Sequence, residues 1–223
     1  MMSNNLPETS PETSPETSPE TSPSKRRQFL KKSTGYVGAA ALGGLSAKPL
    51  LAQDESASED PLPKYGIEGF IAPEITLDYW IDGDGKPTTF SVEGSRGKWV
   101  FMKFFQNWCP GCHSSGFPTL KAVCDEFYGH EMVEIAGIQT VFEGYSTNTQ
   151  EKVRELQQRY DIPAVMGHDP GDKESHIPAV TMINYRTGGT PWLVLVAPDG
   201  SVVFNNFHVN RTKLIEYLHE QIG

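Results

Sequence analysis

The hydrophobic positions of this chain concentrate after residue 70, where they form runs of strand length. The clearest run is residues 99–105, Trp-Val-Phe-Met-Lys-Phe-Phe, in which apolar side chains occupy both faces of one strand. Such a run is typical of a central strand that is covered on both sides. Similar or shorter runs predict further strands at residues 133–141, 164–166, 192–196 and 202–204. The last two are separated by Pro198-Asp199-Gly200, which is a turn signal.

Apolar residues spaced three and four apart predict helices between and after these strands. Three helices and a shorter helical turn are expected: residues 119–128, 148–160 and 211–222, and the turn within 174–185. Ser146 and Thr147 precede the second helix and are expected to cap it, because their hydroxyls can accept the free N–H groups of a first turn.

A second turn signal lies ahead of the predicted central strand. Asp82-Gly83-Asp84-Gly85 separates the β-type runs 75–81 and 88–92, which predicts a hairpin at the start of the domain. Strands and helices then alternate, so we expect one α/β domain with a mixed sheet over residues 71–223. Residues 53–70 include an acidic stretch rich in Ser and Pro and are expected to form a linker.

The first 52 residues have a different composition. Residues 7–22 repeat Pro-Glu-Thr-Ser four times without one apolar side chain. Such a segment cannot bury enough surface to offset its chain entropy, so we expect a disordered leader.

The motif Arg26-Arg27-Gln28-Phe29-Leu30-Lys31 follows and resembles the twin-arginine export signal. Residues 33–47 are mildly apolar and rich in Ala and Gly, and they fall short of the roughly 20 apolar residues of a stable membrane span. Residues 1–52 are therefore expected to be a leader and signal peptide that sends the chain to the periplasm or an equivalent compartment. Cleavage is expected near Ala52. The alternative is a segment retained as a membrane anchor.

The charge balance excludes some partners. The full chain has a formal net charge of −9, and cleavage after Ala52 leaves 13 basic and 24 acidic residues, a net charge of −11. A surface of this sign repels nucleic acid and anionic lipid. We therefore expect no nucleic-acid partner, and membrane contact only if the signal segment is retained.

The candidate chemistry lies in Trp108-Cys109-Pro110-Gly111-Cys112-His113, directly after the predicted central strand. C-x-x-C is the spacing of a redox dithiol, and C-x-x-C-H is also the spacing of c-type haem attachment. At a helix N-terminus, free N–H groups and the helix dipole stabilise an anion and lower a thiol pKa below its free value of ~8.5. Cys109 is therefore the predicted nucleophile, and Cys112, one turn further, is the predicted resolving thiol.

Neighbouring residues are expected to tune and present this dithiol. Pro110 and Gly111 affect the relative stability of its reduced and oxidised forms. Trp108 either shields the disulfide and contacts partners or is a core aromatic side chain. The third cysteine, Cys124, falls on an apolar helical face, where we expect a buried and inert thiol.

The strand, the WCxxC motif and the helix, followed much later by Gly189-Thr190-Pro191 before a hydrophobic strand, resemble the thioredoxin superfamily. The predicted first hairpin, and the additional strand and helix between Val141 and Thr190, are similar to its TlpA-like and redoxin branch. The resemblance covers residues 75–223 and implies a thioredoxin-like fold. It also implies that Pro191 is cis and packs against the dithiol, and that the Thr190 backbone binds the substrate segment.

Two positions depart from the family pattern. Lys103 stands six residues before Cys109, where thioredoxins usually have a buried Asp. If Lys103 lies beneath the dithiol, its charge favours the thiolate and makes the protein more oxidising; alternatively, it pairs with a carboxylate or reaches solvent. Pro118 lies six residues after Cys112, whereas the family has five, and we expect the extra residue to change the shape of the helix.

Three alternatives remain beside a dithiol. A haem carrier would use Cys109, Cys112 and His113, but small c-type cytochromes are helical and loop-rich, so His113 is expected to be an exposed bystander. A thiol peroxidase of the redoxin type shares the fold, yet Met102 and Gln106 stand where those enzymes have Pro and Thr or Ser. A structural metal would need two more ligands than the two thiols.

The sequence thus predicts an exported thiol-disulfide oxidoreductase that needs no cofactor. Its expected partners are protein thiols and disulfides and an unidentified redox partner. The direction of electron transfer stays open at this point.

Overall fold

The computed structural model describes residues 64–223 of the chain. The Pro-Glu-Thr-Ser repeat, the twin-arginine motif, its cleavage point and most of the expected linker lie outside these residues. Within residues 64–223, no helix has the length and apolar character that a membrane crossing requires.

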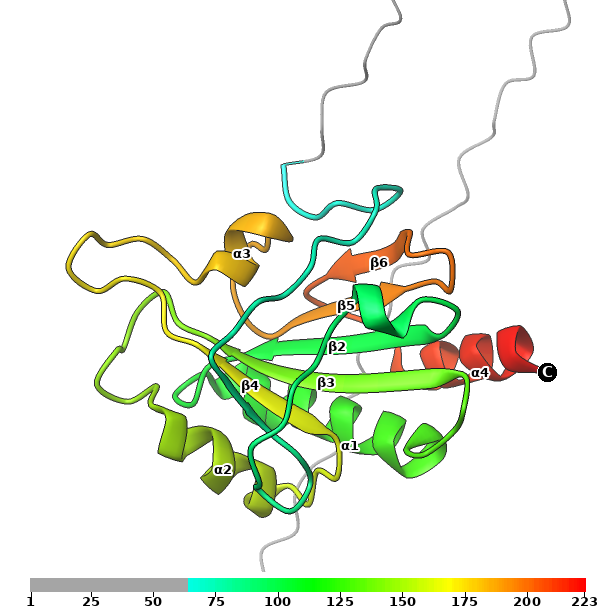
Figure 1. The fold of residues 1–223 in the computed structure, drawn as a ribbon, viewed down its shortest axis with the longest axis horizontal. Helices are drawn as coiled ribbons and strands as arrows, with labels where there is room; N and C mark the ends of the chain where they lie inside the picture. Colours follow the sequence, from blue (N-terminus) through cyan, green and yellow to red (C-terminus); the bar gives the residue numbers. More distant parts are fainter. Residues whose placement is uncertain (1–63) are drawn as a thin grey trace, which may run out of the picture. The chain divides into compact units, whose positions relative to one another are not determined.

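Six strands form one mixed sheet in the order β1-β4-β3-β2-β5-β6 (Figure 1). Their bounds are Tyr79–Ile81 (β1), Trp99–Phe105 (β2), Val133–Thr140 (β3), Val165–Asp169 (β4), Trp192–Val196 (β5) and Val202–Asn206 (β6). Strands β2, β3 and β4 run parallel, whereas β1, β5 and β6 pair antiparallel with β4, β2 and β5 respectively. All seven residues of β2 are buried, which confirms the predicted central strand.

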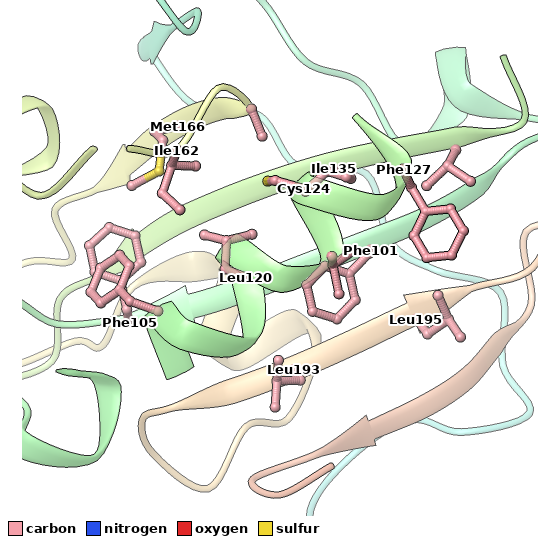
Figure 2. Packing of buried hydrophobic residues seen from close by; sticks show 14 of the residues in the cluster. Phe101, Phe105, Leu120, Cys124, Phe127, Ile135, Ile162, Met166, Leu193 and Leu195 are labelled. Atoms are coloured by element: carbon pink, nitrogen blue, oxygen red, sulfur yellow. The ribbon is translucent and has the colours of Figure 1, made fainter. Parts of the chain in front are cut away.

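The helices gather mainly on one face of the sheet (Figure 1). Their bounds are Phe117–Phe127 (α1), Gln150–Arg159 (α2), Val180–Asn184 (α3) and Arg211–Ile222 (α4), with a 3₁₀ turn at Glu93–Ser95 (η1) and a π-helical turn at Cys112–Gly116 (η2). Leu120 and Cys124 of α1 belong to the same buried cluster as Phe101 and Ile135 of the sheet, as Figure 2 shows. Buried side chains of α2 and α4 complete this cluster.

The opposite face of the sheet is covered largely by chain without long helices. Met102 and Phe104 of β2 belong to a second buried cluster with Ile75 and Trp80, from the segment ahead of β2, and with Tyr185, directly after α3. The predicted α/β fold with a mixed sheet is thus confirmed. Helix α4 has the bounds predicted for it, and α3 is the expected helical turn.

The predicted first hairpin forms only at its turn. The N–H of Asp82 donates to the carbonyl of Lys86, and the N–H of Thr88 donates back to β1. Beyond this point the second arm is not a strand, because the Glu74 carboxylate accepts the N–H groups of Val92 and Glu93 and starts η1 instead. The prediction of a second β-arm was therefore wrong, and β1 pairs with β4 at the sheet edge.

The expected caps of α2 are also displaced. The helix begins at Gln150, and its N-cap Thr149 makes no side-chain capping bond. The Thr147 hydroxyl donates to the carbonyl of Gly144 within the preceding loop. Ser146 and Thr147 therefore belong to a folded loop rather than to the helix start, and the capping prediction was wrong.

Residues of the expected linker pack on the domain. The N–H of Gly69 donates to the carbonyl of Val202, with an N···O distance of 2.8 Å. The N–H of Asn205 donates to the carboxylate of Glu68, at 2.9 Å, and the side chain of Ile67 is buried. The packed chain therefore includes residues ahead of position 71, which run along β6.

Candidate active site

The dithiol motif lies at the junction between β2 and the helix that follows it. Strand β2 ends at Phe105, and the chain is helical from Pro110, so Cys109 directly precedes the first helical residue. The Cys109 carbonyl accepts the N–H groups of Cys112 and His113, which closes the first turn. Cys109 thus occupies the helix N-terminus, as the sequence predicted from its position directly after the central strand.

The sulfur of Cys109 is surrounded by hydrogen-bonding groups. It accepts the N–H of Cys112 at 3.1 Å and lies 3.4 Å from the carbonyl oxygen of Thr190. A hydrogen bond from the Cys112 thiol contributes most to lowering the pKa of Cys109; Thr190 and the Cys112 N–H also lower it, and burial acts in the opposite direction. The resulting pKa is about 5. Cys109 is therefore mainly a thiolate at neutral pH.

The second thiol has the opposite character. Cys112 is fully buried, and this burial raises the pKa of its thiol far above the ordinary value. The hydrogen bond that it shares with Cys109 raises its pKa further. Attraction to Lys103 and then a hydrogen bond from the Gln106 backbone oppose these effects only partly. The pair therefore consists of an ionised Cys109 and a protonated, enclosed Cys112.

The Thr190-Pro191 pair packs over the dithiol. Its peptide bond is cis, as the resemblance implied. A Cβ atom at Gly111 would lie 3.0 Å from Cδ of Pro191, and a Cβ at Gly116 would lie 3.1 Å from Cβ of Pro191. The proline ring therefore packs directly on the start of the helix, and the missing side chain of Gly111 makes room for it.

A buried polar network holds the loop between β2 and Cys109. Trp108 is 43% exposed, so it is not a core side chain, and its indole N–H donates to Oε1 of Gln106 at 2.8 Å. The same oxygen accepts from Nδ2 of Asn148 at 2.9 Å. Oδ1 of Asn148 in turn accepts the N–H of Asn107 at 2.7 Å. The sequence analysis missed Asn148 because its partners lie about 40 residues earlier in the chain.

His113 is not the exposed bystander that the sequence analysis expected. Its ring is half-buried and stacks with the rings of Phe117 and Tyr160. Nδ1 lies 2.7 Å from the Tyr160 hydroxyl, and Nε2 lies 2.5 Å from the carbonyl oxygen of Asn107. The prediction was wrong because the loop before Cys109 and the end of α2 enclose this side chain.

Lys103 is fully buried on β2. Its Nζ donates to the carbonyl of Phe104 at 3.2 Å and lies 5.5 Å from the centre of the Phe117 ring. A Cβ atom at Gly116 would overlap this amine. Burial lowers the pKa of Lys103, and attraction to Cys112 and then Cys109 opposes this shift. Among residues 64–223, no carboxylate forms an ion pair with Lys103.

The extra residue before Pro118 is accommodated in a π-helical turn. The N–H of Phe117 donates to the carbonyl of Cys112, five residues earlier, and the turn η2 spans Cys112–Gly116. A single inserted residue produces such a turn when the helix on either side keeps its packing. The expected change in helix shape is therefore confirmed, and it lies directly beside the dithiol.

The third cysteine and the metal alternative can both be compared with the structure. Cys124 is buried in the main apolar cluster, and burial raises the pKa of its thiol to about 12. In the part of the chain that the structure describes, no group of three or more His, Cys, Asp or Glu side chains is arranged to hold a metal ion.

Solved structures with the same fold include a thiol-disulfide isomerase from Corynebacterium glutamicum. It is 28% identical, with a TM-score of 0.57, and the match covers 67% of this chain and 95% of that one. A thioredoxin-like superfamily protein is 29% identical, with a TM-score of 0.61 and coverage of 69% and 96%. The thioredoxin domain of a thiol-disulfide oxidoreductase from Bacteroides vulgatus is 20% identical, with a TM-score of 0.52 and coverage of 70% and 99%.

No curated protein sequence matches this chain significantly. The model of the AhpC/TSA family matches residues 69–204, which span the sheet from β1 into β6 and include the dithiol and the Thr190-Pro191 pair. The chain has a thioredoxin-like fold and belongs to the AhpC/TSA family.

Proposed function

We propose that this chain is an exported thiol-disulfide oxidoreductase that exchanges disulfides with protein partners through Cys109 and Cys112. One observation carries the proposal: the Cys109 sulfur, at the start of the helix, accepts the N–H of Cys112 and lies 3.4 Å from the Thr190 carbonyl oxygen, with the buried Cys112 one turn behind it. The lowered pKa of Cys109 and the raised pKa of Cys112 favour the first as the attacking thiol and the second as the resolving thiol. Membership of the AhpC/TSA family and the likeness to a thiol-disulfide isomerase support a redox role for these thiols.

The two thiols divide the exchange into two steps. The Cys109 thiolate attacks one sulfur of a substrate disulfide, and the other substrate sulfur leaves as a thiolate and takes up a proton. Cys112 then attacks Cys109, displaces the bound substrate sulfur and forms the Cys109–Cys112 disulfide. The substrate disulfide gains two electrons, and the protein dithiol loses them. The same steps in reverse oxidise a substrate dithiol.

Residues around Cys109 are suited to position a polypeptide substrate. The Thr190 backbone is proposed to hydrogen-bond with the substrate segment in a strand-like manner. Trp108 is exposed beside the motif and offers an apolar surface to that segment. Pro110 and Gly111 shape the helix start on which Pro191 packs, and they are proposed to tune the stability of the disulfide.

A trapped intermediate tests this function. Cys112→Ser leaves Cys109 without a resolving thiol, so a mixed disulfide with a protein substrate such as oxidised ribonuclease is expected to accumulate. Non-reducing gels and intact mass measure this adduct. Cys109→Ser is the matched control and is expected to form none, and adduct formation through Cys124 would contradict the assignment.

The direction of exchange is tested by the reduction potential of the Cys109–Cys112 pair against glutathione. We propose that Lys103 stabilises the reduced form through its charge, because it lies buried beside both thiols. Lys103→Met is therefore expected to make the pair more reducing. An unchanged potential, or a strongly reducing wild-type protein, would contradict this role.

A thiol-dependent peroxidase is the second candidate, and membership of the AhpC/TSA family favours it. In that reaction the Cys109 thiolate would attack one peroxide oxygen, the O–O bond would break with release of water or an alcohol, and Cys109 would become a sulfenic acid. Cys112 would then attack the Cys109 sulfur, form the disulfide and release water. With an added small thiol as reductant, peroxide consumption that persists in Cys112→Ser but is lost in Cys109→Ser would favour it. The Gln106 side chain is already bonded to Trp108 and Asn148 and provides no hydroxyl to position peroxide.

The arrangement does not fit a c-type haem. Both ring nitrogens of His113 are engaged, one with Tyr160 and one with Asn107, so iron ligation would break both contacts. Cys109 and Cys112 are both buried, so thioether bonds from both sulfurs to a porphyrin would require the site to open. Exchange at the dithiol needs no such group.

Export is proposed from the twin-arginine motif and the apolar segment that follows it. In an oxidising compartment such as the periplasm, a disulfide formed by this pair would persist. The partners are proposed to be exported proteins with thiols or disulfides, together with one redox partner that resets the pair.

A further inference from the structure

The turn that leads from β2 to the dithiol is held at each of its peptide groups. The N–H of Cys109 donates to the carbonyl three residues earlier at 3.3 Å, which makes Asn107 and Trp108 the central residues of a β-turn. The N–H of Asn107 donates to Oδ1 of Asn148 at 2.7 Å. The peptide group between Asn107 and Trp108 completes the turn, and its carbonyl oxygen lies 2.5 Å from Nε2 of His113. All three peptide groups of the turn are therefore hydrogen-bonded.

The contact from His113 spans the dithiol along the chain. His113 follows Cys112 in η2, and its backbone N–H donates to the carbonyl of Cys109 at 3.3 Å. Its side chain reaches back six residues to the carbonyl of Asn107. This hydrogen bond closes a loop of chain that contains both thiols. Neither of its two groups is a sulfur atom, so the bond can persist while the disulfide bonds form and break.

The partners of the imidazole define which nitrogen carries its proton. A carbonyl oxygen only accepts, so Nε2 of His113 carries the N–H that Asn107 receives. In the neutral ring Nδ1 then has a lone pair, which accepts the O–H of Tyr160 at 2.7 Å. Tyr160 directly follows α2, and its ring stacks on Phe117 with centroids 4.4 Å apart and an interplanar angle of 3°. The end of α2 and the start of α1 therefore fix the plane of the imidazole.

Resting on the oxidoreductase function proposed above, we propose that His113 is a positioning residue, whose Nε2–H holds the Asn107–Trp108 peptide and keeps the two thiols aligned for the resolving step. In that step the Cys112 sulfur bonds to Cys109, the bond from Cys109 to the substrate sulfur breaks, and the leaving sulfur takes up the proton that Cys112 loses. An attack within one molecule gains its rate from the alignment of the reacting atoms. The first attack, by Cys109 on an incoming disulfide, needs no alignment with Cys112.

A chromogenic aromatic disulfide, 5,5′-dithiobis(2-nitrobenzoate), separates the two steps. Reduced protein releases one coloured thiolate when Cys109 attacks and a second when Cys112 resolves the adduct, and stopped-flow absorbance follows both. His113→Leu fills part of the space of the ring but has no donor for the Asn107 carbonyl. In this variant we expect the second release to slow on the order of 10-fold and the first to change less than about threefold, because only the second depends on the alignment of the thiols.

Rescue by a second donor separates positioning from packing. His113→Gln removes the aromatic ring but keeps an N–H at the end of the side chain, so its second release should return to within about threefold of the wild-type rate. Loss of packing alone would slow the Gln and Leu variants equally. Tyr160→Phe keeps the stacked ring and removes the O–H that orients His113, and its second release should slow about threefold. His219→Leu, which removes an exposed histidine from α4, is the matched control and should leave both steps unchanged.

Several outcomes would overturn the inference. These are an unchanged second release in His113→Leu, equal slowing of both releases, or a Gln variant as slow as the Leu variant. If the His113 variants fail to fold, Tyr160→Phe decides: selective slowing of the second release supports positioning, and an unchanged rate contradicts it. Long-range ¹H–¹⁵N spectra of the wild-type protein at alkaline pH should show His113 protonated on Nε2, and the opposite tautomer would also contradict it. Absence of a first release that depends on Cys109 would instead refute the oxidoreductase function.

Discussion

At the scale of single residues, the two thiols of the motif differ in ionisation although both are buried. Cys109 receives hydrogen bonds from the thiol and the N–H of Cys112, whereas Cys112 has little to offset its burial. Residues three positions apart thus acquire opposite properties, because one lies at the helix N-terminus and the other one turn inside. This asymmetry makes one thiol the attacking group and leaves the other protected.

Alkylation should report this asymmetry directly. With a pKa of about 5, Cys109 loses its proton as the pH rises through that value. The rate of reaction with iodoacetamide, followed by mass spectrometry, is expected to increase with pH up to about 6 and then to level off. Cys112→Ala removes the largest cause of the lowered pKa and should move the midpoint upward.

The control for this experiment is the third cysteine. Burial raises the pKa of Cys124 to about 12, so Cys124 should stay unmodified over the same range in the folded chain. A midpoint near the free-thiol value of ~8.5 for Cys109 would contradict the hydrogen-bonding account.

At the scale of elements, the start of the helix after β2 has an unusual shape. The π-helical turn Cys112–Gly116 absorbs one residue between the dithiol and Pro118. It leaves the α1 side chains Leu120 and Phe127 in the apolar cluster (Figure 2) while Gly116 remains against Lys103 and Pro191. The turn therefore lets α1 keep its packing on the sheet while the residues around the thiols keep their contacts.

The segment ahead of β1 is a second element with a measurable role. Gly69 and Glu68 hydrogen-bond with β6, and Ile67 is buried beside them. A chain that begins at residue 71 is expected to lose about 2 kcal/mol or more in free energy of unfolding, from one buried side chain and the lost hydrogen bonds. Urea unfolding of the reduced chain measures this change.

A chain that begins at residue 64 is the matched control and should unfold like the mature protein. Equal stability of the two shortened chains would show that residues 64–70 contribute only passive contacts along β6.

At the scale of the whole molecule, the proposed twin-arginine signal is expected to decide the compartment in which the dithiol works. Replacing both Arg26 and Arg27 by Lys in the full chain should leave the protein in the cytoplasm, since adjacent arginines are what the twin-arginine route recognises. Cell fractionation measures the distribution, and N-terminal sequencing of the exported protein should give a start near Gln53. Lys48→Gln lies outside the motif and should not change export. Equal export of the double variant would refute this route.

The same scale explains how the site is assembled. The dithiol comes from the β2–helix junction, the cis-proline from the start of β5 and Asn148 from the loop before α2. Strand β2 lies between β3 and β5 in the sheet, which brings these distant segments to the same end of the central strand (Figure 1). The fold thus acts by placing groups from separate parts of the chain around two sulfur atoms.

Local sequence was sufficient for much of this description. The apolar run of β2 and the helical spacing of α4 show which faces each element buries. The pattern repeats within a few residues, every two in a strand and every three or four in a helix, so it can be recognised locally. The C-x-x-C spacing likewise identifies the dithiol, because the two thiols meet within one helical turn. These features need no knowledge of distant contacts.

What the sequence left open depends on long-range partners. Lys103 was equally compatible with solvent, an ion pair or a place under the thiols, and only the position of Gly116 and Phe117 against β2 selects the last. His113 looked exposed because its partner Tyr160 lies 47 residues away. The second arm of the first hairpin did not form, and the Glu74 carboxylate accepts the N–H of Val92 at its end and of Glu93 after it. Sequence alone therefore determined most of the elements and the reactive pair, whereas tertiary structure decided the surroundings of that pair, because burial and hydrogen-bond partners are set by chain topology.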